Sequence, residues 1–125
     1  MSGNNIILDT NIALYLLDGD EVLVEYLQDK TFYLSLVNEM ELLGFKDITE
    51  DEEIVIKFFL DDCSVVDINQ GIKDIAIKLR KTYSIKLPDA IVAATAVFLG
   101  IPLISADKHF DKISELTFIL YKPTI

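Results

Sequence analysis

Four acidic residues of this sequence stand beside apolar segments, at positions from which carboxylates could hold a metal ion. Asp9 directly follows the apolar run at residues 6–8, and Asp107 follows a largely apolar run at residues 102–106. Asp89 is the only ionisable side chain of the long apolar segment in which it lies. Short apolar runs are typical of buried strands, and open parallel sheets bind ligands at the carboxyl ends of their strands. We therefore expect these acids to meet at one edge of a sheet.

Glu41 is the fourth acid, and its place follows from helical periodicity. Stepping the segment at residues 37–45 by about 100° per residue puts Val37, Met40 and Gly44 on one face. Glu41 then falls about 40° from Val37, inside or beside that face. A carboxylate near an apolar face is costly to bury unless it is paired or bound to a metal.

Each acid taken alone also has an ordinary structural explanation. Asp9 could cap the helix that follows it, and Asp107 could cap a short helix or lie in a loop. Glu41 could extend from the rim of the core into water, while Asp89 suits the positive end of a helix dipole. The pattern of all four acids is therefore more informative than any one of them.

Four carboxylates at one edge repel one another, which raises their pKa values. A hard divalent cation removes this repulsion; Mg²⁺ prefers a few oxygen ligands with several waters, and Mn²⁺ accepts the same site. Such a cation lowers the pKa of a water and stabilises charge on a phosphodiester. The motifs of rival chemistries are missing from the sequence: it has one histidine, His109, and no glycine-rich phosphate loop, Gly-x-Ser-x-Gly segment or Cys/His zinc pattern. We expect His109 at the surface or at a helix start.

The segments that must position these acids alternate between strand and helix patterns, which favours a parallel sheet covered on both faces. The predicted strands are 5–8, 32–36, 63–68, 102–105 and 116–121. The predicted helices are 12–17, 21–28, 37–45, 50–60, 70–83, 88–99 and 110–113. Pro88 opens the apolar helix that contains Asp89, and Gly100 stops it. Cys63 is expected in the core of the third strand.

The composition of the chain bounds the class of protein. Its 125 residues suit a single domain over 1–125, and its lone cysteine suits a reducing cytosol. No apolar stretch approaches the roughly 18 residues of a membrane span, so we expect a cytoplasmic protein that does not bind membranes. The formal net charge of −10 argues against a broad basic surface. A nucleic-acid substrate would therefore need metal ions and a local basic patch.

In four segments the sequence resembles the PIN-domain family, in particular the VapC-like toxin ribonucleases. The segments are Leu8-Asp9-Thr10-Asn11, Ser35-Leu36-Val37-Asn38-Glu39-Met40-Glu41-Leu42-Leu43-Gly44, Leu87-Pro88-Asp89-Ala90 and Leu103-Ile104-Ser105-Ala106-Asp107-Lys108-His109-Phe110. Their order and spacing and the total length all fit, so the resemblance covers nearly the whole chain. It implies a three-layer α/β/α fold with a central parallel sheet of about five strands.

The resemblance also implies Mg²⁺- or Mn²⁺-dependent cleavage of RNA by a toxin that is often a homodimer and is often held inactive by an antitoxin protein. Carried over by motif, the acidic quartet around the metal looks like Asp9, Glu41, Asp89 and Asp107. The supporting polar residues look like Thr10, Asn11 and Ser105. Asn38 stands where many relatives have a threonine, and Asp111 is a candidate for a further acid that some relatives carry. Candidates for phosphate contacts near the motifs are Lys46, Lys86 and Lys108.

Two other functions stay open at this point. The first is a receiver-like signalling domain, which has the same size and sheet type, binds Mg²⁺ at the strand ends and would use Asp67 as its phosphate acceptor. Against it, the first strand ends in a single acid, and Asp89 and Asp107 would have no role. The second is a non-catalytic binding protein on the same fold, which the complete quartet disfavours.

Overall fold

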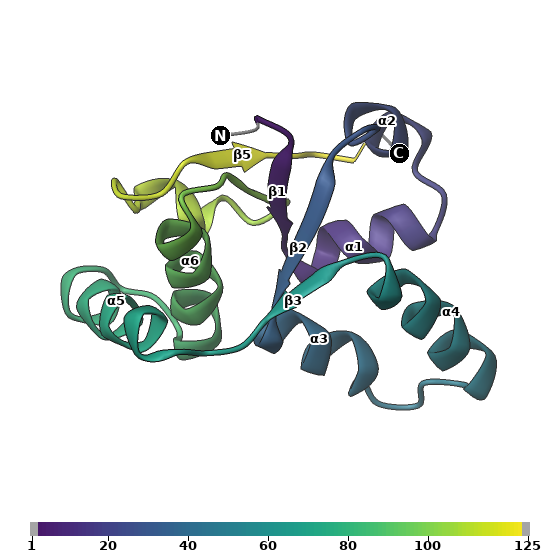
Figure 1. Cartoon of the computed structure of the whole chain (residues 1–125), viewed down its shortest axis with the longest axis horizontal. Coiled ribbons are helices and arrows are strands. Elements are labelled where there is room, and N and C mark those ends of the chain that lie inside the picture. The colour runs from purple at the N-terminus through teal and green to yellow at the C-terminus, as the bar shows by residue number, and fades with distance from the viewer. Residues whose placement is uncertain (1–2, 124–125) are drawn as a thin grey trace.

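A parallel sheet of five strands forms the centre of the computed structural model, which describes residues 3–123 (Figure 1). The strands are β1 (Asn5–Leu8), β2 (Thr31–Ser35), β3 (Ser64–Val66), β4 (Leu103–Ser105) and β5 (Phe118–Leu120). Their order is β3-β2-β1-β4-β5, and all neighbouring pairs are parallel. The central place of β1 explains its continuous apolar sequence, because Ile6, Ile7 and Leu8 are buried on both faces.

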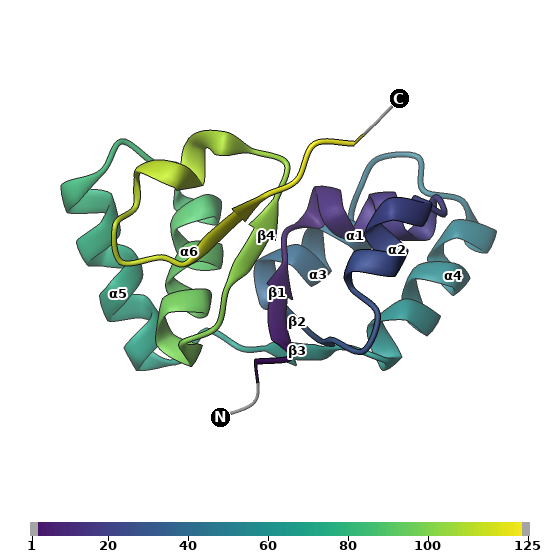
Figure 2. The same cartoon turned by 90° about the horizontal axis from the view of Figure 1, so that it is seen from above.

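Helices cover both faces of this sheet, which confirms the predicted three-layer α/β/α fold. They are α1 (Thr10–Leu17), α2 (Glu21–Tyr26), α3 (Leu36–Leu43), α4 (Glu50–Asp61), α5 (Gln70–Thr82), α6 (Leu87–Leu99) and the 3₁₀ helix η1 (Lys108–Lys112). Figures 1 and 2 show α5 and α6 on one side of the sheet and α1, α2 and α4 on the other. The side chains of β1 alternate accordingly: Ile7 packs into the core with α5 and α6, whereas Ile6 and Leu8 pack with α1 and α2.

Helix α6 is buried along most of its length, as its apolar sequence predicts. Its small side chains Ala90, Ala93, Ala94 and Ala96 are fully excluded from solvent and let the helix pack closely against its neighbours. Gly100 ends α6 in the left-handed conformation, with φ of +68°, which glycine adopts without steric strain. None of the helices within residues 3–123 is long and apolar enough to cross a membrane.

The predicted inner face of α3 is wrong. The buried residues of this helix are Val37, Asn38 and Leu42, whereas Met40 is 56% exposed. A helix of eight residues holds too few apolar side chains to fix its face, and a buried asparagine does not mark a core position in a sequence. The ends of the other elements differ from the prediction by at most two residues. The domain expected over 1–125 includes residues 1–2 and 124–125, which lie outside the described residues.

The segment after β5 is tied back to the first pair of helices. The backbone N–H of Tyr121 donates to the carbonyl of Ser105. The hydroxyl of Tyr121 donates to Asp20 Oδ2 at 2.7 Å. The same aspartate caps α2 by accepting the N–H of Leu23. The ring of Tyr121 packs against Tyr15 with 6.3 Å between centroids. This contact therefore joins the early and late parts of the chain on the α1–α2 side of the sheet.

Candidate active site

The four predicted acids meet around one cavity of about 610 Å³ at the carboxyl edge of the sheet. Asp9 and Asp107 follow the ends of β1 and β4, which are adjacent and parallel. Glu41 comes from α3, and Asp89 comes from the first turn of α6. The polar side chains of the lining are Asp9, Thr10, Asn11, Glu41, Asp89 and Asp107, and the part of the lining that the structure describes contains no lysine or arginine. The cavity therefore concentrates negative charge.

Asp9 is the most buried member of the quartet, with 8% of its surface exposed. One carboxylate oxygen accepts the backbone N–H of Thr10 at 2.9 Å, and the other accepts the hydroxyl of Ser105 at 2.6 Å. The N-cap explanation of Asp9 is thus correct, because this residue does cap α1. The same side chain also faces the cavity, so its structural role and a role in the site do not exclude each other.

Glu41 and Asp89 are held in different ways. Thr10 Oγ1 donates to Glu41 Oε1 at 2.6 Å, which links α1 to α3 and keeps this exposed carboxylate over the cavity. Asp89 is half-buried in the first turn of α6. Within residues 3–123 no hydrogen bond reaches its carboxylate, so Asp89 is the quartet member whose oxygens are free to bind a cation or substrate.

Asp107 forms a compact unit with His109 at the start of η1. Its Oδ1 accepts the backbone N–H of His109 at 2.9 Å and lies 2.5 Å from the ring atom Nδ1. The imidazole is exposed at a helix start, as the sequence predicts. The backbone N–H of Asp107 donates to Ser105 Oγ at 3.0 Å. Since that hydroxyl also donates to Asp9, one serine connects two acids of the quartet.

The remaining predicted supporting residue, Asn11, joins α1 to the end of β4. Its amide oxygen accepts the backbone N–H of Ala106 at 3.2 Å, and its amide nitrogen lies 3.5 Å from Ser105 Oγ. Thr10, Asn11 and Ser105 therefore all contact a member of the quartet or the backbone beside one. Their placement fixes the relative positions of β1, β4 and α3 at this edge.

Asn38 connects the site in a way that sequence reasoning missed. Its side chain is fully buried, and its amide oxygen accepts the backbone N–H of Ser35 at 3.0 Å, which completes a capping box for α3. Its amide nitrogen lies 3.0 Å from Thr10 Oγ1 and 3.4 Å from Asp9 Oδ1. The sequence carries half of this signal, since a serine followed three residues later by a side-chain amide has capping-box spacing.

Burial dominates the electrostatics of the two deeper acids. It raises the pKa of Asp9 despite the opposing hydrogen bonds, and the charges of Glu41 and Asp107 add to the rise. Burial also raises the pKa of Asp89, followed by repulsion from the other three carboxylates. Burial acts in the same direction on Asp107, but the hydrogen bonds and charge of His109 together lower the pKa of that carboxyl. The surroundings of Asp9 and Asp89 therefore disfavour the negative charge of these two carboxylates.

This donor set fits a hard divalent cation. The titratable groups that line the cavity are carboxyl groups, with neither a thiol nor an imidazole among them, and oxygen ligands suit Mg²⁺ and Mn²⁺. Between residues 3 and 123, no three His, Cys, Asp or Glu side chains converge closely enough to surround an ion as they stand. Mg²⁺ in enzymes commonly binds through one or two carboxylates, with waters and substrate phosphates as its other ligands. The spread of the four carboxylates around the cavity is compatible with binding of this kind.

The other candidates from the sequence lie outside this cavity. Lys46, Lys108 and Asp111 are exposed and line neither the acidic cavity nor the one beside it. Lys86 lies in the adjoining cavity, close enough to Asp89 for its charge to oppose part of the rise that burial and the other carboxylates cause in the pKa of that carboxyl. Of the three predicted lysines, Lys86 is therefore the one that approaches the site.

The receiver-like alternative is wrong. A receiver-type sheet has the order 2-1-3-4-5, which places the third strand next to the first, whereas β3 here is an edge strand beyond β2. Asp67 follows β3 as an exposed residue and lies outside the lining of the acidic cavity. Cys63 is also no nucleophile, because it packs at the core and burial raises the pKa of its thiol to about 12.

The chain is similar to proteins of one known family. The family model described as PIN domain matches residues 6–116. A search of curated proteins found no match. Among solved structures, a toxin-antitoxin complex from Klebsiella pneumoniae contains a similar chain, with 28% sequence identity and a TM-score of 0.78. That similarity covers 95% of this chain and 98% of the other.

Two more solved structures share the fold at lower sequence identity. VapBC2 from Rickettsia felis, bound to a DNA fragment from its promoter, has a TM-score of 0.84 at 18% identity, over 94% of this chain and 99% of that chain. VapBC-1 from nontypeable Haemophilus influenzae has a TM-score of 0.78 at 23% identity, over 93% and 97%. The family match includes all four acids of the quartet and most of the chain, and this protein therefore belongs to the PIN-domain family.

Proposed function

We propose that this protein is a metal-dependent endoribonuclease and the toxin component of a toxin–antitoxin pair. The observation that carries the proposal is the meeting of four carboxylates, from four separate segments, in one cavity that no basic side chain lines among the described residues. Such carboxylates bind Mg²⁺ or Mn²⁺. When bound, the cation supplies a water of lowered pKa and neutralises charge on a phosphodiester. Membership of the PIN-domain family supports the same conclusion.

The chain's own residues have distinct tasks in this proposal. Asp9 is a rigid ligand, because Ser105 and Asn38 fix its carboxylate. Asp89 and Asp107 complete the ligand set, and the exposed carboxylate of Glu41 accepts a proton from the attacking water. The water forms a bond to phosphorus as the bond to the 3′ oxygen breaks. The products are a 5′-phosphate and a 3′-hydroxyl, whose oxygen takes its proton from solvent.

The test is incubation of total cellular RNA with the protein and Mn²⁺, followed by mapping of new 5′-phosphate ends. We expect discrete ends from the wild type and none from Asp9→Asn. Since Asp9 also caps α1, circular dichroism must show that the variant is folded, and Asp89→Asn serves as a second variant without that structural role. If the wild type binds Mn²⁺ through Asp9 but cuts nothing, its RNA target is missing from the sample. If it neither binds Mn²⁺ nor cuts RNA, the protein is a non-catalytic binding protein.

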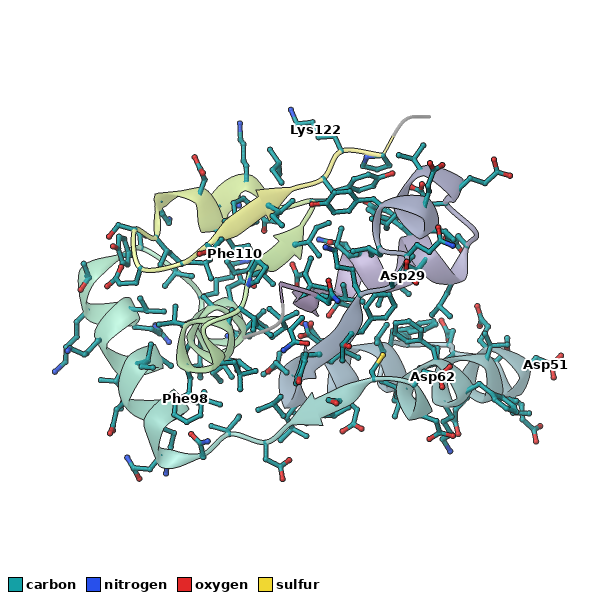
Figure 3. The ribbon with its side chains drawn as sticks, turned by 45° about the horizontal axis from the view of Figure 1, so that its top comes forward. Asp29, Asp51, Asp62, Phe98, Phe110 and Lys122 are labelled. Atoms are coloured by element: carbon teal, nitrogen blue, oxygen red, sulfur yellow. The ribbon has the colours of Figure 1, made fainter. Side chains whose placement is uncertain are left out.

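An antitoxin partner is the second part of the proposal. Helix α4 exposes the apolar side chains Ile54, Val55 and Phe58 on one face, and Phe58 is 73% exposed. An uncovered apolar strip of this kind marks an interaction surface. Four acids at residues 50–53 start the same helix, and Asp51 projects from its outer end (Figure 3). We therefore expect an antitoxin segment that is amphipathic and basic.

Co-purification from the native host tests this partner. Phe58→Asp should abolish co-purification of the antitoxin and leave RNA cleavage by the separated protein unchanged. Ile77→Asp is the matched control, because Ile77 is a similarly exposed apolar residue on α5. Loss of the partner from both variants would contradict a role for α4. A homodimer and a cytoplasmic location complete the proposal, and light scattering of the purified protein measures the former.

A further inference from the structure

A second cavity, of about 520 Å³, adjoins the acidic one and is lined by basic side chains as well as by carboxylates. The two cavities share Asp89 and Asp107 as a common wall. The second cavity is also lined by three basic residues and the histidine: Arg80, Lys86, Lys112 and His109. We call this second cavity the basic cleft. Among the described residues, Asp89 and Asp107 therefore separate a cavity without basic side chains from one that contains three.

Three separate elements bring the cations of the basic cleft together. Arg80 lies in the last turn of α5, Lys86 is the N-cap residue of α6, and Lys112 ends η1. Lys112 Nζ donates to the backbone carbonyl of Ser84, which holds its ammonium group at the cleft. Lys86 makes no side-chain hydrogen bond to the helix that it precedes. In residues 3–123 none of the three cations forms an ion pair with a carboxylate, so their charges are available to a ligand.

The cleft is unusual for the molecule as a whole. With a net charge of −10, most of the surface repels a polyanion such as RNA. A backbone phosphate that approaches the quartet therefore needs cations on its way in. The basic cleft supplies them directly beside Asp89 and Asp107, and it is open to solvent.

We infer that the basic cleft binds the backbone phosphates next to the scissile bond, with Arg80, Lys86 and Lys112 as the contacting residues. The inference rests on the proposed ribonuclease function and adds the path of the substrate. The scissile phosphate lies over the quartet, and its neighbours along the strand lie in the cleft. The Arg80 guanidinium offers several donors to phosphate oxygens, and the two lysines act as point charges. None of these contacts reads a base, so the cleft gives affinity and register rather than sequence preference.

Two triple variants with the same net charge test this path. The cleft variant is Arg80→Gln, Lys86→Gln and Lys112→Gln. The control variant is Lys73→Gln, Lys81→Gln and Lys122→Gln, three exposed residues outside the cleft, of which Lys122 projects outward beyond β5 (Figure 3). Both lose three positive charges, so any effect of overall charge is equal. The probe is a short fluorescein-labelled single-stranded RNA of mixed sequence, bound in Ca²⁺, which occupies carboxylate sites.

For the cleft variant we expect RNA affinity to fall about 100-fold at 0.1 M salt, with a log–log salt slope lower by about 2. The control variant should stay within a few-fold of the wild type. Equal losses in both variants would overturn the inference, since they would reflect overall charge. If neither variant loses affinity while the wild type cleaves RNA, the cleft is not the path, although the proposed function stands. If the wild type neither binds nor cleaves any RNA, both proposals fail.

A second measurement places the contact along the strand. RNAs with a neutral methylphosphonate at one position at a time should bind the wild type more weakly when the neutral group lies beside the cleavage site. The same substitution should leave binding by the cleft variant unchanged, because its contact is already lost. A methylphosphonate effect of equal size in the two proteins would contradict a contact with the cleft.

Discussion

At the scale of single residues, Asp89 carries a charge that the fold disfavours. Burial and the neighbouring carboxylates raise the pKa of this group above its ordinary value of 3.8, so the folded protein binds the proton more tightly than the unfolded chain. Stability without metal therefore falls as the pH rises from 3.8 through the raised value, and it stays reduced above that value. Asp89→Asn should accordingly raise the Tm in EDTA at neutral pH and lower RNA cleavage by about 100-fold or more.

Thermal melts with and without Mg²⁺ measure the first effect. The cation should raise the Tm of the wild type more than that of Asp89→Asn, because binding to the folded state stabilises it. Asp67→Asn is the matched control, since Asp67 is an exposed aspartate at the end of the edge strand β3. A Tm for Asp89→Asn below that of the wild type in EDTA would contradict the repulsion argued for this site.

The buried amide of Asn38 provides a second prediction. Asn38→Ala leaves the buried N–H of Ser35 without an acceptor, at a cost of about 1–3 kcal/mol. RNA cleavage should fall as well, because Asp9 and Thr10 lose a donor that positions them. Asn69→Ala is the control: Asn69 caps α5 far from the quartet by accepting the N–H of Ile72, and its loss costs about 1 kcal/mol. We expect urea unfolding to show destabilisation of both variants, whereas cleavage falls for Asn38→Ala alone. Equal activity of the two would mean that Asn38 is merely a cap.

Three of the four acids could be placed from the sequence because each follows a strand pattern or opens an apolar helix, and parallel topology sends such positions to one edge; Glu41, inside α3, had only helical periodicity to place it. Asp9 and Asp107 are the clearest cases. The role of Asn38 could not be predicted, since its partner Asp9 lies 29 residues away. Arg80 and Lys112 were missed for the same reason: each looks like a solvated residue until α5 and η1 pack beside α6.

At the scale of elements, the stop of α6 at Gly100 sets where β4 begins. A Cβ at Gly100 meets no atom within 4 Å, so the cost of a side chain there comes from the left-handed backbone alone. Gly100→Ala should destabilise the protein by about 1 kcal/mol, and Gly100→Asn by less, because asparagine tolerates this conformation. Urea unfolding of the two variants measures the difference.

Gly44 is the contrasting control at the end of α3. Its φ is −105°, but a Cβ would lie 2.6 Å from the carbonyl oxygen of Met40. The cost there is steric, so asparagine should be no better than alanine. If asparagine were tolerated better than alanine at position 44 but not at position 100, the steric cost argued for Gly44 and the backbone cost argued for Gly100 would both be wrong.

Most elements could be predicted because their signals are local. Pro88 and Gly100 bracket α6, and acids at residues 50–53 mark the start of α4. The face of α3 could not be predicted, since its inner side carries the buried amide of Asn38 between the core residues Val37 and Leu42, and the helix also borders the cavity at Glu41. Apolar periodicity predicts which face of a helix is buried only where the buried residues are apolar, and α3 buries a polar one.

At the scale of the whole molecule, the hydrogen bond from Tyr121 to Asp20 links the late segment to the first helices. It raises the pKa of Tyr121 to about 12 and lowers the pKa of Asp20. Its contribution to stability is complete below pH 10.0, the ordinary pKa of a tyrosine, and is lost as the pH rises to about 12. The chain contains five tyrosines and no tryptophan, so ultraviolet absorbance follows tyrosine ionisation without interference.

An alkaline titration of the wild type and Tyr121→Phe tests this bond. Their difference in absorbance should show one step near pH 12. A step near pH 10 would mean that the bond to Asp20 does not persist in solution. Acid should weaken the same contact, since the lowered pKa of Asp20 means that the stabilisation is lost as the pH falls below 3.8.

The central place of β1 has a consequence for synthesis of the protein. This strand is translated before the other four strands of the sheet, and Ser105, which orients Asp9, lies 96 residues further along the chain. A nascent chain that has emerged only as far as α6 contains Asp9, Glu41 and Asp89 but lacks both β4 and Asp107. Translation itself therefore delays completion of the site until β4 and Asp107 emerge. For a ribonuclease of the proposed kind, that delay keeps the enzyme inactive while its own message is still being read.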